Sequence, residues 1–599
     1  MDDGLRYAHG ALRMDDGQVR FRLWAPGSQA VSLHLEDEAL PMKSLDGGWF
    51  EARHPCPAGA VYCFEPEGVG KVPDPASRFQ ASDVDGPSVV VDHTTYPWIN
   101  DAWRGRPWTE TVFYEAHPGL LGGFDGLRQR LPALAELGIT ALELMPVADF
   151  PGPWNWGYDG VLPYAPDRAY GTPDSLKALV DAAHGLEIMV FLDVVYNHFG
   201  PVGNRLASYA PQFFRDDADT PWGPAIDLRR EPVRSFFTEN ALYWLREYRF
   251  DGLRFDAVHA MVDKDEWLGQ LPMRLREALP ADRQVHLVLE NDSNQASLLR
   301  RGFDAQWNDD IHHVVHHLLT GESMGYYAAY EQRSTEKLAR ALAQGFIYQG
   351  EPSPAHDNRP RGEPSSMLPR SSFIFFLQNH DQVGNRAQGE RLTTLCRSRP
   401  EALRAAVALQ LLSPSIPLIF MGEEQGEENP FLYFTSFPDP EFAAKVREGR
   451  RAEFAAFHDI KGEAVPDPNA EDTWRASLLS SDDSAAAQQW RAYYRDLLAL
   501  RRDHITPWLK GTECDSVLVV SPGCLIACWV LGNDCHLTLY CNLSDDKVNL
   551  APGLQDARET IFFESMQGAA AALRAGAMPP HCTIASLRRA GEQTEMGHP

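Results

Sequence analysis

Acidic, histidine and arginine side chains follow four short apolar runs in the middle of the chain. In chain order they are Asp193 and His198, then Arg254 and Asp256, then Glu290, and finally His380 and Asp381. One carboxylate at the end of a strand is usually a helix cap or a salt-bridge partner. Four such ends that together carry carboxylates, two histidines and an arginine indicate a single reactive site.

The chemistry that requires this set is glycoside hydrolysis with retention of configuration. It needs one ionised carboxylate to attack the anomeric carbon and a second, protonated carboxylate to donate to the leaving oxygen. Arg254 and Asp256 are two residues apart, so on a strand they face the same way, and the guanidinium would keep Asp256 ionised. Glu290 follows the apolar Leu289, and desolvation would keep its proton in place. Asp381 and the two histidines are then expected to bind sugar hydroxyls.

Short apolar runs alternate with helical patterns between about residues 110 and 500. The runs are TVFYEAH, ITALELMP, IMVFLDVVYNH, GLRFDAVH, VHLVLEND, FDAQWNDD, SFIFFLQNHD and IPLIFMGEE. Eight strand–helix alternations predict an α/β fold, the (β/α)8 TIM barrel, whose active site lies at the carboxyl ends of its strands. Amphipathic patterns at 127–138 and 173–185 predict two of the intervening helices. The stretch 345–370, rich in Pro, Gly and charge, is expected to be a long functional loop.

Patterns of period two lie on both sides of the predicted barrel. Residues 17–95 alternate in VRFRLWAP and VSLHLED, and strand patterns return after about residue 512 in SVLVVS, CLIACWVL and HLTLYCNLS. The chain is therefore predicted to have three domains. They are an N-terminal β-sandwich at 1–100, a catalytic barrel with inserted loops at 101–510 and a C-terminal β-sandwich at 511–599.

The composition excludes several classes of partner. The 599 residues include 55 Lys plus Arg against 83 Asp plus Glu, and the net charge of −28 makes nucleic acid a poor partner. Aromatic residues make up 11% of the chain and suit stacking on a neutral sugar. No run reaches the ~18 apolar residues that span a bilayer, and MDDGLRYAHG lacks the apolar core of a secretory signal. We expect no membrane association and a cytoplasmic location.

No metal or other cofactor is expected. The nine cysteines include no CxxC pair, which argues against zinc and fits a reducing compartment. A histidine cluster lies at i, i+4 spacing on one predicted helix, at His312, His313, His316 and His317. No carboxylate or cysteine nearby in the sequence completes an evident zinc set with it. A run of acidic residues after the eighth strand is expected to be mostly solvated, at Glu423, Glu424, Glu427 and Glu428.

Four ordered strings resemble the signature regions of the α-amylase superfamily, glycoside hydrolase family 13. They are DVVYNH (193–198), GLRFDAVH (252–259), LENDSN (289–294) and QNHDQ (378–382). The resemblance implies that Asp256 is the nucleophile, Glu290 the acid/base and Asp381 the third essential carboxylate. It also implies supporting, substrate-binding positions at Asp193, His198, Arg254 and His380, with Tyr158 of NWGYDGV as the aromatic platform under the reacting glucose.

A narrower resemblance covers nearly the whole chain, in segments such as VPDPASRFQ, DFPGPWNWGYDGV, YQGEPS, QNHDQVGNRAQGERL and PFLYFTSF. These are similar to the trehalose-releasing branch of the superfamily, which cuts the α-1,4 bond next to the terminal trehalose of malto-oligosyltrehalose. The N-terminal module resembles the carbohydrate-binding β-sandwich that precedes such barrels. Loops particular to this branch supply further candidates for substrate contact: Trp156, expected on an exposed loop, and Asn308, Asp309, Gln382 and Arg386.

Two alternatives remain open from the sequence. A branching or debranching enzyme would share the barrel and the N-terminal module. An inactive glucan-binding scaffold would share the fold but would not need Asp256, Glu290 and Asp381 together. The expected partners are malto-oligosyltrehalose and related α-glucans, and the chain is expected to be a monomer or a homodimer.

Overall fold

A closed barrel of eight parallel strands lies at the centre of the molecule. The computed structural model describes residues 7–588 except 15, 221–222, 456–464, 481–482 and 557. The barrel strands, in spatial order, are β9 (Phe113–Ala116), β10 (Ala141–Leu144), β13 (Met189–Val194), β16 (Gly252–Phe255), β17 (His286–Leu289), β18 (Ala305–Trp307), β21 (Phe373–Phe376) and β22 (Ile416–Phe420). Each predicted apolar run contains one of them, so the (β/α)8 barrel is confirmed.

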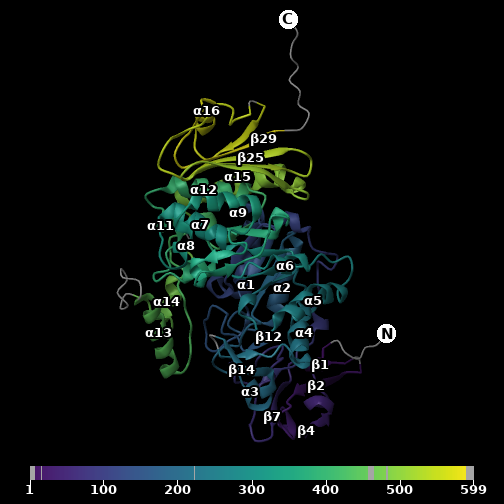
Figure 1. The fold of residues 1–599 in the computed structure, drawn as a ribbon. Coiled ribbons are helices and arrows are strands. Elements are labelled where there is room, and N and C mark those ends of the chain that lie inside the picture. Colours follow the sequence, from purple (N-terminus) through teal and green to yellow (C-terminus); the bar gives the residue numbers. More distant parts are fainter. Residues whose placement is uncertain are drawn as a thin grey trace.

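Helices surround the barrel (Figure 1). Both helices predicted from amphipathic patterns are present, as α1 (Gly123–Leu137) and α2 (Pro173–Gly185). The Thr172 side chain accepts a hydrogen bond from the Ser175 backbone N–H at the start of α2, which satisfies an otherwise unpaired donor. The other long helices are α4 (Glu231–Glu247), α5 (Lys264–Glu277), α7 (Asp309–Thr320), α9 (Ser334–Gln344), α12 (Pro400–Leu412), α13 (Pro440–Ala455) and α15 (Ala485–His504).

Strand register brings polar side chains together inside the barrel. Asp193 on β13 is paired with Arg254 on β16, and Glu115 on β9 is paired with Glu143 on β10. Paired residues of parallel strands face the same side of a sheet, and all four of these side chains are buried. The barrel interior is therefore polar near the carboxyl ends of its strands, where the candidate reactive residues begin.

Antiparallel sheets lie at the two ends of the molecule (Figure 1). Two four-stranded N-terminal sheets contain β1 (Gly10–Arg13), β2 (Gln18–Trp24), β6 (Trp49–Pro55) and β5 (Lys43–Leu45), and β4 (Glu38–Pro41), β3 (Val31–Leu35), β7 (Val61–Pro66) and β8 (Ser88–Val89). The C-terminal sheet contains β23 (Glu513–Ser521), β24 (Cys524–Val530), β25 (His536–Asn542), β29 (Cys582–Arg588) and β27 (Thr560–Glu564), beside the pair β26 (Val548–Asn549) and β28 (Ala577–Met578). These sheets complete the predicted fold class, and the exact domain boundaries stay predictions.

Three two-stranded antiparallel sheets lie in segments that connect barrel strands and helices. They pair β11 (Ala148–Asp149) with β12 (Leu162–Pro166), β14 (Phe214–Thr220) with β15 (Gly223–Ile226), and β19 (Glu351–Ser353) with β20 (Arg359–Arg361). The last hairpin belongs to the segment 345–370 that the sequence marks as a functional loop. None of the helices in the described part of the chain has both the length and the apolar character needed to cross a bilayer. Residues 1–6, on which the leader prediction partly rests, lie outside the described residues.

Gly252 is the position where the barrel tolerates no side chain. A Cβ there would lie 2.1 Å from a ring carbon of Phe191 and 2.6 Å from the carbonyl oxygen of His286. We expect Gly252→Ala to reduce the free energy of unfolding by about 1–3 kcal/mol, because the Phe191 ring and β17 must move. Thermal unfolding followed by circular dichroism measures the loss.

The matched control for this change is Gly449→Ala. Gly449 lies within α13, and a Cβ there meets nothing within 4 Å. Alanine is the better helix former, so this substitution should leave stability unchanged or raise it by up to ~1 kcal/mol. Equal melting temperatures for Gly252→Ala and the unmodified protein would contradict the packing argument.

Candidate active site

A buried arginine joins two carboxylates at the carboxyl ends of β13 and β16. Arg254 Nη1 lies 2.7 Å from Asp193 Oδ2 and 2.6 Å from Asp256 Oδ1. The Asn197 amide also donates to Asp256, at 2.8 Å. Burial opposes ionisation of Asp256, but Arg254, His198 and Asn197 outweigh it and hold the pKa of this carboxyl below its ordinary value. Asp256 is therefore ionised at neutral pH.

Glu290 stands at the end of the next strand, β17, in the opposite electrostatic state. Its Oε2 accepts a hydrogen bond from the Ala257 backbone N–H at 2.5 Å and lies 4.0 Å from Arg254 Nη2. Burial raises the pKa of Glu290 well above its ordinary value despite Arg254, and the charges of Asp256 and other nearby carboxylates add to the increase. The pKa values of the two carboxyls are thus shifted in opposite directions, and their roles as nucleophile and acid/base stay a prediction.

An aromatic and a histidine form one wall beside Asp193. The ring of Tyr158 stacks on that of His380, with 5.0 Å between centroids, and its hydroxyl donates to Asp193 Oδ2 at 2.6 Å. His198 Nε2 lies 3.0 Å from the Tyr158 carbonyl oxygen. His380 Nδ1 contacts buried Glu115 at 2.5 Å, and although burial opposes the charge, Glu115 raises the pKa of His380 above its ordinary value. These contacts fix the Tyr158 ring.

Asp381 and the remaining candidate residues differ in how deeply they are buried. Asp381 is exposed and accepts from the Asn385 amide at 2.5 Å. Asp309 lies close enough to Asp292 and Asp381 that burial, followed by these two charges, raises its pKa to about 7. Gln382 Nε2 reaches Asp309 Oδ1 at 3.4 Å, which places both on the same side of the site.

Three candidates are occupied by protein contacts. The Asn308 amide donates to the Gly345 carbonyl at 2.9 Å, and Arg386 forms a bidentate pair with Glu322 at 2.7 and 2.8 Å. Trp156 is buried rather than on an exposed loop, which corrects the expectation for its segment. Its indole stacks on Phe431 and meets His380 edge-on. Substrate contact by these three residues stays a prediction, since their resolved contacts are structural.

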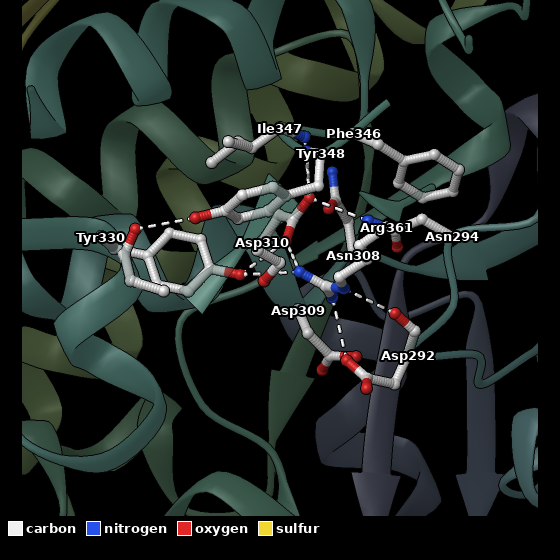
Figure 2. Close-up of polar contacts among 12 residues, drawn as sticks. Asp292, Asn294, Asn308, Asp309, Asp310, Tyr330, Phe346, Ile347, Tyr348 and Arg361 are labelled. Atoms are coloured by element: carbon white, nitrogen blue, oxygen red, sulfur yellow. Dashed lines mark hydrogen bonds and ion pairs between the residues drawn. The ribbon is translucent and has the colours of Figure 1, made fainter. Parts of the chain in front are cut away.

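Sequence reasoning missed several residues that complete the site. Glu115, which pairs with His380, and Glu143 are buried one strand apart in the barrel, where a period-two pattern in FYEA and ALEL signals inward-facing carboxyls. Burial, with the charges of Glu115 and Asp193, raises the pKa of Glu143 well above its ordinary value, so Glu143 is a neutral acid. Arg361 and Asp310 form a further buried ion pair at 2.7 Å (Figure 2). Nothing in the sequence pairs these two residues.

The acidic run after the eighth strand was expected to be mostly solvated, and the structure corrects this expectation for two of its residues. Glu423 and Glu427 are buried, not solvated. Glu423 accepts hydrogen bonds from the Phe420 backbone N–H and the Tyr494 hydroxyl, and Glu427 accepts from residues of a neighbouring loop at Ser480. Both carboxyls tie the end of β22 to surrounding segments, which is a structural role.

The histidine cluster on α7 is engaged in protein contacts. His312 Nδ1 lies 2.8 Å from the Leu377 carbonyl, and His316 Nε2 lies 2.8 Å from Glu322. In the described part of the chain, three possible metal ligands gather only at Asp515, Cys528 and His536, on the C-terminal sheet rather than the barrel. All nine cysteines are free thiols.

Comparison with known proteins adds independent evidence. Residues 76–209 match the alpha amylase catalytic domain, and residues 8–76 match carbohydrate-binding module 48, the isoamylase N-terminal domain. Malto-oligosyltrehalose trehalohydrolases from Deinococcus radiodurans and Saccharolobus solfataricus are 42% and 37% identical, each over 88% of this chain and over 90% and 91% of their own lengths. A solved structure of an alpha-amylase-type protein from Salmonella typhimurium has a TM-score of 0.91 at 43% identity, covering 97% of this chain and 100% of that one.

The barrel, its paired carboxylates and the preceding carbohydrate-binding module define a glycoside hydrolase of the α-amylase family. Within that family, identity above 35% over most of both chains decides the branch. The chain belongs to the malto-oligosyltrehalose trehalohydrolases.

Removal of the central arginine should destabilise the protein in a pH-dependent way. Arg254→Met leaves Asp193 and Asp256 buried without their shared cation, and breaking a buried pair in this manner costs about 3–5 kcal/mol. Without the cation, the folded-state pKa of Asp256 should rise above that of the unfolded chain, and the pKa of Asp193, which burial already raises to about 6, should rise further. The stability of the variant should then fall as pH rises from 5 to 8. The reason is that the unfolded chain releases these protons more readily than the folded chain, so the free energy of unfolding decreases with pH.

The measurement is the melting temperature of the variant and the unmodified protein across that pH range. Arg359→Met, at an exposed arginine paired with Asp357, is the control and should show no such pH dependence. A loss in Arg254→Met that is equal at pH 5 and pH 8 would show that lost packing, rather than unpaired charge, dominates.

Proposed function

We propose that this chain is a retaining glycosidase that cleaves the α-1,4 bond next to the terminal trehalose of malto-oligosyltrehalose and releases free trehalose. One observation carries the proposal. Arg254 binds the ionised Asp256 directly, while Glu290 on the adjacent strand keeps its proton through burial. That division of protonation states is what double displacement at a glycosidic carbon requires. Family membership supports the particular substrate.

In the first step, an oxygen of Asp256 attacks the anomeric carbon of the glucose on the non-trehalose side of the bond. As the C1–O bond breaks, Glu290 transfers its proton to the departing oxygen, and trehalose leaves as a neutral alcohol. The Asp256 carboxylate becomes a glycosyl ester. Arg254 needs no reorganisation during this step, because its other contact, to Asp193, holds it in place.

In the second step, water takes the place of trehalose. Glu290, now a carboxylate, accepts a proton from this water, whose oxygen attacks the same carbon and frees Asp256. Two inversions give net retention, so the shortened glucan is released as its α-anomer. The ring of Tyr158 would stack on one face of the reacting glucose, and Asp381 would accept hydrogen bonds from its hydroxyls. The contacts of Tyr158 with Asp193 and His380, and the closeness of Asp381 to His380, support these roles.

Partners and location follow from the same evidence. The carbohydrate-binding module match supports α-glucans as the wider ligand class. Nine free thiols support a reducing cytoplasm as the compartment.

The function is tested by comparing two substrates of equal chain length. Malto-oligosyltrehalose should be hydrolysed with kcat/KM at least ~10-fold above the plain malto-oligosaccharide, a preference of ~1.4 kcal/mol. Product analysis should show free trehalose, and proton NMR should show the α-anomer of the new reducing end first. Equal rates would indicate a general amylase, new α-1,6 linkages a branching enzyme, and an initial β-anomer an inverting mechanism.

Substitution of the two carboxylates tests their roles. Asp256→Asn should abolish turnover because no nucleophile remains, and Glu290→Gln should lower kcat by about 10²–10⁴-fold, or 2.7–5.5 kcal/mol. Asp265→Asn, an exposed residue of α5, is the control and should be fully active. If either catalytic variant kept more than about a tenth of the kcat with unchanged folding, its assigned role would be wrong.

The charge of Asp309 offers a test of how Glu290 keeps its proton. Asp309 is one of the carboxylates that raise the pKa of Glu290. Above about pH 7, where Asp309 is ionised, Asp309→Asn removes a negative charge, so the pKa of Glu290 should fall and the acid should lose its proton at lower pH. The alkaline limb of the kcat/KM profile should therefore shift to lower pH, whereas Asp357→Asn, at the exposed hairpin tip, should leave it in place. A limb that does not move, or moves upward, contradicts the electrostatic account.

A further inference from the structure

Three side chains that can bind a metal ion meet on the C-terminal sheet, each from a different strand. They are Asp515 on β23, Cys528 on β24 and His536 on β25, and one ligand atom from each lies within 4.8 Å of the other two. Cys528 Sγ and His536 Nδ1 are 3.9 Å apart. Tetrahedral zinc, with bonds of about 2.3 Å to sulfur and about 2.0 Å to nitrogen, places two such atoms about 3.5 Å apart. Small side-chain movements therefore complete this geometry.

Strand register explains why Cys528 and His536 share a face of the sheet. Cys528 is paired with Thr538, and His536 lies two residues before Thr538 on β25. Residues two apart on a strand face the same side, and diagonal neighbours across two antiparallel strands are within reach of one another. The Thr538 hydroxyl, 3.7 Å from Cys528 Sγ, lies on this face too. The thiol and the imidazole are thus brought together by the hairpin itself.

A bulge in the edge strand β23 keeps the third ligand beside them. Cys514 is paired with Trp529. Ser516 is paired with Cys528, which is the residue before Trp529 on β24. Asp515 is therefore an extra residue, and in a β-bulge both residues of the bulged strand stand opposite one residue of its partner. The bulge places the Asp515 carboxylate opposite Cys528.

The charge around the Cys528 thiol favours a cation. Burial raises the pKa of this thiol to about 11, and the negative charges of Asp515 and Glu559 add to the increase, although the Thr538 hydroxyl opposes it. The thiol therefore keeps its proton at neutral pH when no cation is near. A divalent ion bound here would offset the neighbouring carboxylates and displace the proton of Sγ to the solvent, which leaves a thiolate ligand.

Few protein contacts compete with a metal ion for these ligands. Among the residues that the structure describes, no salt bridge engages Asp515 or His536, and the polar contact of the His536 ring is with Cys528. Arg588 is paired with His536 in register, but its guanidinium is directed to Asp556, at 3.4 Å. Asp515 is exposed, and Cys528 and His536 are half-buried, so an ion can reach them from the solvent.

We infer that Asp515, Cys528 and His536 form a zinc site whose fourth coordination position is open to water. A thiolate, an imidazole and a carboxylate suit Zn²⁺, whereas Mg²⁺ and Ca²⁺ prefer oxygen ligands alone. The ion would join the edge strand β23 to β25 across β24 and so stabilise the C-terminal sheet. No CxxC pair marks this site, because its ligands come from three strands. The inference does not rest on the proposed function.

Cobalt is the first probe, because Co²⁺ replaces zinc and reports a sulfur ligand by its absorption. With the thiols of the full chain kept reduced, an equimolar amount of Co²⁺ should give a thiolate-to-cobalt charge-transfer band in the near ultraviolet. Cys528→Ser should abolish this band. Cys514→Ser is the matched control and should keep it, because Cys514 is a half-buried thiol of the same two strands that packs with Trp529 against the core on the other face.

Zinc affinity and thermal stability are the second measurement. Competition with a chromophoric chelator should show saturable zinc binding by the unmodified protein, and Cys528→Ser, His536→Gln and Asp515→Ala should each weaken it at least about tenfold. Changes to residues that only support a metal ligand already cost about 10–100-fold, and the loss of a direct ligand should cost no less. Zinc should raise the melting temperature of the unmodified protein and of Cys514→Ser, and raise it less in the three ligand variants.

The outcomes decide between a built site and adventitious binding. Circular dichroism without added metal checks the folding of each variant, and if Cys528→Ser fails to fold, His536→Gln and Asp515→Ala decide. The inference is overturned if the unmodified protein gives no charge-transfer band, or if Cys514→Ser loses the band as Cys528→Ser does. Zinc binding that is equally tight in the ligand variants and the unmodified protein would show an adventitious ion only, and would overturn it as well.

Discussion

The active site depends on one buried cation. Arg254 lies inside the barrel, close to Asp193 and Asp256 at once, and a charge in such a place is stable only when it is paired. The two contacts have different consequences. The pair with Asp193 fixes the guanidinium to the neighbouring strand, and the pair with Asp256 keeps that carboxyl ionised. Because Glu290 lies farther from Arg254, burial dominates there and the second carboxyl keeps its proton.

Two further carboxyls, Glu115 and Glu143, are buried in the barrel close to this arrangement. Glu115 is paired with His380, which in turn supports Tyr158 by stacking. Glu143, one strand away from Glu115, is a neutral acid because burial and nearby negative charge both oppose its ionisation. A protonated Glu143 adds no charge to the barrel. The net effect is a barrel end whose charges are matched locally, so that the field at the glycosidic bond comes from a few fixed groups.

A second arginine, Arg361, is held between two carboxylates in the same way. Arg361 is paired with buried Asp310 in the way that Arg254 is paired with Asp193, and it presents Asp292 as Arg254 presents Asp256. The difference is exposure. Asp256 is mostly enclosed, whereas Asp292 is partly exposed. Two arginines held by buried carboxylates thus orient two further carboxylates, one at the carboxyl end of β16 and one on the loop that follows β17.

The sequence alone was sufficient for the barrel and for the reactive set, because both depend on local patterns. Strands buried on both faces read as apolar runs, and Arg254 and Asp256 share a face through their spacing of two. It was not sufficient for the burial of Trp156, Glu423 and Glu427, which depends on which loops cover them. Nor did it bring Arg361 to Asp310 or to Asp292, since Arg361 lies 51 and 69 positions from these two residues. Contacts across such separations are set by how the strands close into a barrel, and only the tertiary structure decides them.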